Sequence, residues 1–241
     1  LVTSLVPHSI ALTGLRVVAP AGAAWCIWAA TQQPDGDSVL RIAGFGWMVP
    51  VLALVFAAET GAWFVNGPAY PNERRFALKP PGPVLFGPLP LAWALAVGAP
   101  TAGALLLAGG SYVLGGVILV VGTAASAVLL RALHGLARRW VVFVPAGFVL
   151  HDPLALVDPV LFRRKEIEAL RAAPAGSPAL DLTKGALGLA LELMLLEKVP
   201  MALVKPGQAL GEQGASAQLM FSPSRPGQVL AEAKARRLPV G

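Results

Sequence analysis

Two charged residues interrupt otherwise apolar stretches, and their positions point to the first possible chemistry. Arg16 lies in the apolar run at residues 10–31, and Glu59 lies in the run at 42–64. A charge at the centre of a bilayer costs up to about 3 kcal/mol, and such residues often bind a counter-charge, a proton or a headgroup. We expect Arg16 and Glu59 to form an ion pair or to share a polar pocket beneath residues 66–79. The alternatives are that Glu59 handles a proton or a headgroup, or that both side chains snorkel independently to the interface.

The depth of the two charges favours the pair. If the first apolar run starts on the inner side of a membrane at residue 10, Arg16 lies about 9 Å deep at 1.5 Å per helical residue. If the second run ends on the same side at residue 64, Glu59 lies about 7.5 Å deep by the same rise. Consecutive antiparallel helices would thus carry opposite charges at matching depths.

A second group of candidates is basic and lies in the last hundred residues. Its members are Arg138, Arg139, Arg163, Arg164 and Lys165. Each basic residue near an anionic membrane surface contributes about 1 kcal/mol, so these residues could bind lipid headgroups or a protein partner. The alternative is a solvated charge run that only sets the membrane topology.

The sequence predicts no catalytic residue, metal site or cofactor. The three histidines, His8, His134 and His151, have no metal-ligand spacing. His151 and Asp152 could act as an acid–base pair, but Asp152 precedes a proline and is typical of a turn. No nucleophile elbow, phosphate-binding loop or dinucleotide fingerprint is present. The single cysteine, Cys26, allows no intrachain disulfide.

The segments that carry Arg16 and Glu59 are predicted to be membrane helices. Hydrophobic residues make up 56% of the 241-residue chain and charged residues only 13%, about half the charged fraction of a soluble domain. Residues 80–130 contain no Asp, Glu, Lys, Arg or His, and this stretch is long enough for two spans of ~20 residues. The predicted transmembrane domain covers residues 1–137. We expect four spans at about 10–31, 42–64, 89–108 and 112–133, with a turn at 34–37 and a kink at Pro50.

The distribution of basic residues predicts the orientation. Arg74, Arg75, Lys79, Arg131, Arg138 and Arg139 would lie on one side of a four-span protein, and Arg41 on the other. Positive loops stay in the cytoplasm. We therefore expect a multi-pass protein of the cell inner membrane or plasma membrane, with both termini cytoplasmic. The Pro- and Gly-rich connector at residues 65–87 is expected to run extended along the membrane surface.

From residue 138 the composition changes to that of a small cytoplasmic domain, predicted over residues 138–241. Short β-rich runs alternate with turns, and leucines at every second position from Leu187 to Leu195 favour a strand. Ser222-Pro223-Ser224-Arg225-Pro226 is typical of a helix start, with Ser as the N-cap. The following helix would bury Val229, Leu230 and Ala233.

This order of elements resembles the bacterial PH-like domain. The resemblance is carried by RRWVVFVPAGFVLHDP, LFRRKEIEAL and QLMFSPSRPGQVLAEAKARRL. It implies a strongly bent sheet that is closed at one end by the final helix, on a multi-span helical anchor. It also implies a binding or scaffold role and transfers no catalytic residues.

The fold class expected is therefore an α-helical integral membrane domain of about four transmembrane helices plus a small, mainly-β PH-like domain with a C-terminal helix. The expected function is non-enzymatic: the cytoplasmic domain docks a protein partner or the inner leaflet, as an accessory or scaffold subunit of a membrane complex. The alternative is a membrane enzyme or transporter subunit that acts on lipid-linked substrates. Nucleic-acid binding is not expected, because the basic residues are scattered and no recognition helix is visible.

Overall fold

In the computed structural model the chain forms two compact units, and residues 7–32, 38–205 and 207–241 are described. The helical unit comprises Leu1–Phe64 and Gly87–His134. The β unit comprises Val65–Phe86 and Gly135–Gly241. The turn expected at residues 34–37 lies outside the described residues.

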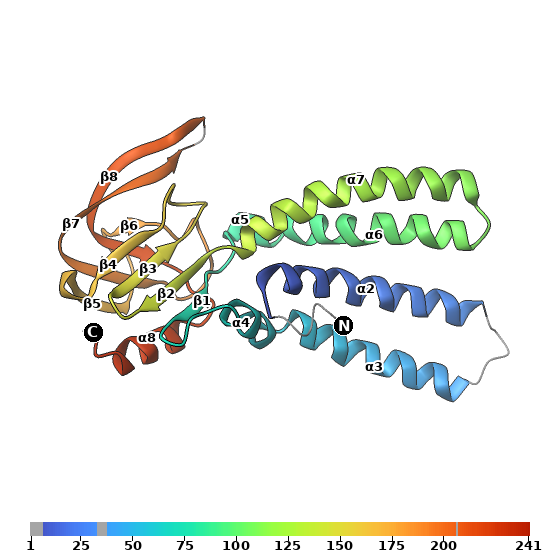
Figure 1. Ribbon diagram of the computed structural model, residues 1–241, viewed down its shortest axis with the longest axis horizontal. Helices are drawn as coiled ribbons and strands as arrows, with labels where there is room; N and C mark the ends of the chain where they lie inside the picture. Colours follow the sequence, from blue (N-terminus) through green and yellow to red (C-terminus); the bar gives the residue numbers. More distant parts are fainter. Residues whose placement is uncertain (1–6, 33–37, 206) are drawn as a thin grey trace. The chain divides into compact units, whose positions relative to one another are not determined.

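Long apolar helices make up the helical unit (Figure 1). They are α2 (Ser9–Thr31), α3 (Ser38–Phe56), α4 (Ala58–Asn66), α6 (Pro88–Ala108) and α7 (Tyr112–Ala137). Within the described part of the chain, three helical segments, which contain α2, α6 and α7, are long and apolar enough to cross a membrane. A fourth is added if α3 and α4, bent by 50° at their junction, form one span. The prediction of several apolar helices followed by a mainly-β region is confirmed at that level.

The helix expected over residues 42–64 is interrupted at Ala57, whereas Pro50 lies inside α3. The Ala57 amide donates to the Leu54 carbonyl at 3.2 Å, which tightens the last turn. The Thr60 hydroxyl donates to the same carbonyl at 2.6 Å. The Leu54 carbonyl at the end of α3 thus accepts from both a backbone amide and a side-chain hydroxyl. The 50° bend therefore lies at the α3–α4 junction, beyond Pro50, where these hydrogen bonds stabilise it.

α6 and α7 pack closely through small residues, which let helix backbones approach each other. A methyl group on Gly103 would lie 2.6 Å from the Cα of Leu119 on the facing helix. A methyl group on Gly115 would lie 2.7 Å from an amide nitrogen of α6. The buried Ser126 hydroxyl also donates to the Ala96 carbonyl across the two helices, at 2.5 Å. The two backbones could not approach this closely with larger side chains at these positions.

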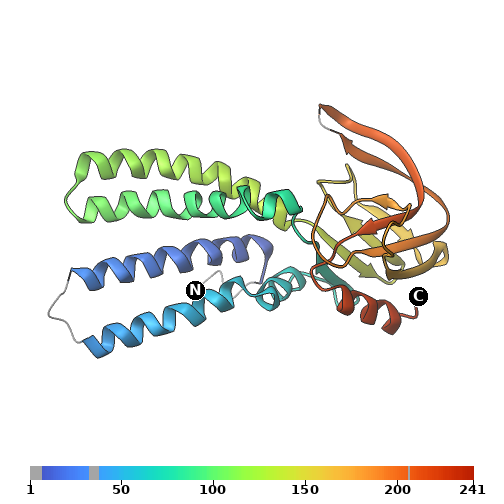
Figure 2. The same cartoon turned by 180° about the vertical axis from the view of Figure 1, so that it is seen from behind.

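In the described residues the β unit contains two four-stranded sheets. The first is antiparallel with the order β1 (Arg74–Ala77), β2 (Trp140–Val144), β3 (Gly147–His151), β4 (Val160–Arg163). The second has the order β5 (Ile167–Ala172), β7 (Leu191–Lys205), β8 (Gln208–Phe221), β6 (Leu180–Asp181), and β6 runs parallel to β8. Between the sheets in sequence lies the short 3₁₀ turn η1 (Arg164–Glu166). Figures 1 and 2 show β7 and β8 as a long hairpin that extends beyond the other strands.

Buried side chains from both sheets form one core. At its centre the Phe148 ring lies 5.2 Å from that of Phe143, 6.4 Å from that of Phe162 and 5.4 Å from that of Phe221, between ring centroids. These four rings come from β2, β3, β4 and β8. Aromatic rings bury large apolar areas, so this cluster is a major source of the unit's stability.

The C-terminal helix α8 (Pro226–Ala235) completes this core. Val229 and Ala233 are fully buried and Leu230 packs at the core's edge, as predicted. The N-cap differs from the prediction. It is Arg225, without a side-chain cap, whereas the Ser224 hydroxyl donates to the Ala77 carbonyl at 3.0 Å. Ser224 therefore fastens the start of α8 to the end of β1.

Two further expectations are corrected in the β unit. The connector does not simply run extended, because Arg74–Ala77 pairs with β2 and buries Phe76 in the core. β1 lies at the edge of the first sheet, next to β2. The strand expected from Leu187 begins only at Leu191. Gly185 and Gly188 have φ values of +69° and +87° and form a loop before it.

Candidate functional site

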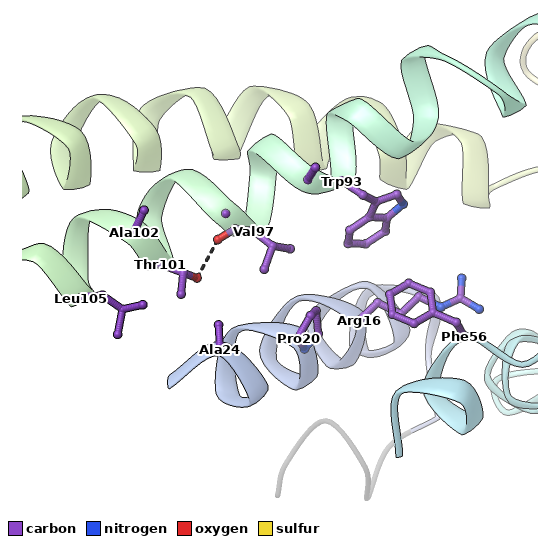
Figure 3. Close-up of a pocket in the computed structure, with 11 residues that line it drawn as sticks. Arg16, Pro20, Ala24, Phe56, Trp93, Val97, Thr101, Ala102 and Leu105 are labelled. Carbon is purple, nitrogen blue, oxygen red and sulfur yellow. Dashed lines mark hydrogen bonds between the residues drawn. The ribbon is translucent and has the colours of Figure 1, made fainter. Parts of the chain in front are cut away.

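A cavity of about 480 Å³ lies beside α2 and α6 in the helical unit. Figure 3 shows Arg16, Pro20 and Ala24 on one wall and Trp93, Val97, Thr101, Ala102 and Leu105 on the other, with Phe56 at the Arg16 end. Apart from Arg16 and Thr101, these side chains are apolar. The site therefore combines an apolar channel with a single cationic group at one end.

The Arg16 guanidinium is held by the end of α3. Its Nε donates to the Val55 carbonyl at 3.3 Å, and its Cζ lies 5.6 Å from the centroid of the Phe56 ring. A methyl group on Gly61 of α4 would lie 3.5 Å from Nη2. The Val55 carbonyl and the Phe56 ring, at the end of α3 next to the break at Ala57, thus hold this arginine.

Near Arg16, a polar contact joins α2 to α7. Thr13, one turn before Arg16, has its hydroxyl 3.3 Å from Nδ1 of His134 on α7. The Trp93 and Phe56 rings meet edge to face, with centroids 6.2 Å apart. Only the proximity of α2 and α7 brings Thr13 and His134 together, and no spacing in the sequence signals it.

Glu59 lies in the first turn of α4, two residues before Gly61, whose position is next to the Arg16 guanidinium. The structure thus brings α4 to Arg16. The ion pair between Arg16 and Glu59 stays a prediction.

Arg139 does not belong to an exposed basic cluster. Its side chain is 2% exposed. Nε and Nη2 donate to the two carboxylate oxygens of Asp152, each at 2.7 Å, and Nη1 donates to the Lys79 carbonyl at 2.7 Å. Asp152 also accepts from the Leu154 amide at 3.1 Å, which is the turn role that the sequence indicated. Arg139 is therefore a structural residue and is not available to a headgroup.

Arg163, Arg164 and Lys165 are exposed at the β4–η1 junction, beside Ala146. Arg164 donates to the Arg236 carbonyl at the C-terminal end of α8, where a cation is favourable. Arg163 pairs with Gly147, at the end of the first sheet where the β2–β3 turn lies. Arg138 precedes β2 and therefore lies at the other end of that strand. The five predicted basic residues therefore do not form one site.

His151 packs against Trp140, with ring centroids 5.1 Å apart. Burial lowers the pKa of His151, and the nearby charge of Arg138 lowers it further, while Asp152 acts in the opposite direction. Because Asp152 is bound to Arg139, the geometry favours a packed neutral imidazole over the acid–base pair.

Within the described ranges, no group of three His, Cys, Asp or Glu side chains is placed to hold a metal ion. Comparison of the chain with protein-family models, curated proteins and solved structures gave no match.

Proposed function

We propose that this chain is a multi-pass membrane protein whose PH-like β unit docks on the inner leaflet, as an accessory or scaffold subunit rather than an enzyme. The observation that carries the proposal is the loop before β7, whose leucines are exposed and whose backbone is hydrogen-bonded to the segment that leads into α6. The two-sheet β unit closed by α8 supports the PH-like assignment. The excess of Arg and Lys on one side of the four helices supports cytoplasmic termini.

The loop that precedes β7 is held against α5 (Gly82–Leu85). The Gly82 amide donates to the Gly185 carbonyl at 3.1 Å, and Nζ of Lys79 donates to the Leu187 carbonyl at 2.8 Å. Leu187 and Leu189 nevertheless keep 52% and 49% of their surface exposed. Neighbouring exposed apolar side chains can form part of an interaction surface when they make one contiguous patch.

Chain connectivity supports a position of this loop near a membrane surface. α5 ends at Leu85 and α6 begins at Pro88. Three residues span at most about 10 Å. If α6 crosses the bilayer, α5 and the attached Leu187 must lie close to the headgroups. Phe86, which is 77% exposed, lies in the same short link.

The chemistry of the loop suits an anionic leaflet. Burial of a leucine side chain contributes about 1.5–3 kcal/mol, and a basic residue near the surface adds about 1 kcal/mol. Lys79 contacts the loop and Lys184 is exposed within it. Leucines that enter the interface and lysines that bind headgroups would together hold the β unit on the lipid surface.

A depth measurement tests the docking. The full chain with Cys26→Ser and Leu187→Cys would be labelled with an environment-sensitive dye and placed in nanodiscs that contain nitroxide-labelled lipids. We expect strong quenching at position 187. The control is Leu210→Cys, because Leu210 is 84% exposed near the far end of the β7–β8 hairpin. That end lies about 40 Å along β7 from the start of the strand at Leu191, at 3.3 Å per residue. Quenching at 187 no stronger than at 210 would contradict the docking.

A second candidate function is recruitment of an acidic protein through Arg163 and Lys165. Both are exposed, and in the described part of the chain neither side chain has an ion-pair partner. Charge reversal of both should abolish co-purification of such a partner. Reversal of the exposed Lys198 on β7 should not.

A further inference from the structure

We propose that the Arg16 cavity binds one acyl chain of an anionic phospholipid, with the lipid phosphate on the Arg16 guanidinium. This assignment rests on the membrane placement of the helical unit proposed above. It adds a specific lipid site, distinct from the docking of the β unit on the leaflet.

The cavity has the shape and chemistry of a chain-binding channel. It follows α2 from Arg16 to Ala24 and α6 from Trp93 to Leu105, which is about 12 Å and 18 Å of helix at 1.5 Å per residue. Thr101 is the one hydroxyl among the lining residues, and it donates to the Val97 carbonyl at 2.6 Å. The wall beyond Arg16 therefore presents an apolar surface to an occupant.

Arg16 supplies the charge that selects the headgroup. Its Nε is occupied by the Val55 carbonyl. Its two terminal nitrogens are not used by that bond. These nitrogens carry four N–H donors in a planar fork, which suits two phosphate oxygens. A phosphate there would neutralise the guanidinium and so lower the free-energy cost of holding a charge beside an apolar lining.

The occupant must be both anionic and long. A free phosphate would engage Arg16 and leave most of the 480 Å³ without a partner. A neutral acyl chain would fill the channel and offer no acceptor to the guanidinium. A phospholipid satisfies both ends with one molecule, and the bilayer supplies it at high concentration.

The test uses the full chain in mild detergent and native mass spectrometry. Phosphatidylglycerol and phosphatidylcholine with matched acyl chains are the two probes. We expect a one-to-one complex with phosphatidylglycerol that Arg16→Gln weakens about tenfold, equivalent to ~1.4 kcal/mol. Arg131→Gln is the matched control, because Arg131 is exposed on α7 outside the cavity lining. Equal binding of both lipids, or equal loss with either variant, would overturn the proposal.

A cavity-filling pair tests the position of the acyl chain. Gly98 lines the cavity and Gly116 does not, and a methyl group on either glycine meets no atom within 4 Å. Gly98→Leu should therefore fill the channel and reduce lipid binding, whereas Gly116→Leu should leave it unchanged. Full binding by Gly98→Leu would show that the chain lies elsewhere. Complete competition by glycerol phosphate would show that Arg16 binds the headgroup alone, which also overturns the acyl-chain assignment.

The outcomes separate this proposal from the proposed function. Unaltered phosphatidylglycerol binding by Arg16→Gln, with position 187 still quenched, overturns only the lipid site. Loss of quenching at 187, with the lipid preference intact, overturns only the docking of the β unit. A chain that stays monodisperse in buffer without detergent would overturn both.

Discussion

The Arg139 guanidinium joins three segments of the β unit: the start of β2, the turn that contains Asp152, and the end of the connector at Lys79. Both charges of the pair are almost fully buried. A buried pair is costly to desolvate, but removal of one partner leaves an uncompensated charge and is strongly destabilising. Arg139 thus links these three segments through buried hydrogen bonds.

Arg139→Gln should lower the free energy of unfolding by about 3–5 kcal/mol, because it leaves the Asp152 carboxylate buried without its counter-charge. Thermal or denaturant unfolding of the full chain in detergent measures the effect. The neighbouring and exposed Arg138 is the matched control, and Arg138→Gln should change stability by no more than ~0.5 kcal/mol. Similar losses in the two variants would refute the structural role.

His151 makes the stability of the β unit depend on pH. Its pKa is lowered from 6.5, first by burial and then by Arg138, so the unfolded chain binds its proton more readily than the folded chain. Its contribution is complete above pH 6.5 and decreases as pH falls from 6.5 toward the folded-state pKa. His151→Gln should flatten this part of the profile of unfolding free energy against pH. An unchanged slope in the variant would assign the pH dependence to other groups.

The predicted pairing of Arg16 with Glu59 can be measured by a double-mutant cycle. Glu59→Gln should lower detergent stability, and adding Arg16→Gln should recover part of that loss if the two side chains interact. Thermal unfolding of the four proteins gives the coupling energy. Losses that simply add would exclude the pair, and the retained bond from Arg16 to the Val55 carbonyl would then be its main anchor.

At the scale of elements, the contact between α6 and α7 depends on the absence of side-chain atoms at Gly103. Gly103→Val would place carbon within 2.9 Å of Leu119, and overpacking of this kind costs about 1–3 kcal/mol or more. Gly116→Val is the control, because a methyl group there meets no atom within 4 Å. The first variant should lower the midpoint of thermal unfolding in detergent and the second should not. Equal midpoints would mean that the two helices adjust freely.

The sequence predicted the elements with strong local signals and missed those that depend on tertiary contacts. The charge-free stretch at 80–130 located α6 and α7, because composition alone distinguishes such a run. Burial of Arg139 was not predictable, since nothing local shows that Lys79 and Asp152 converge on it. The strand at Arg74–Ala77 was missed for the same reason, because four residues in a Pro-rich connector gain their strand geometry from pairing with β2.

At the scale of the whole molecule, the β unit is assembled from two separate parts of the chain. The fragment 138–241, which the sequence analysis treats as a complete domain, lacks β1 and the Lys79 carbonyl that binds Arg139. It should be less stable and more prone to aggregate than a fusion in which residues 65–86 are joined to 135–241 through a flexible linker. Circular dichroism melts and size-exclusion profiles of the two proteins provide the comparison. Equal stability would show that β1 contributes little.

The split of the β unit also constrains how the protein is made. Arg74 of β1 pairs with Phe143 of β2, so the ribosome must synthesise α6 and α7 before the first sheet can close. At ~5–20 residues per second this interval is roughly 3–14 s. During that time the Phe76 side chain has no core to enter. If α6 and α7 cross a membrane as proposed, their insertion can precede folding of the β unit. A nascent chain stalled within α7 should remain sensitive to protease at the connector.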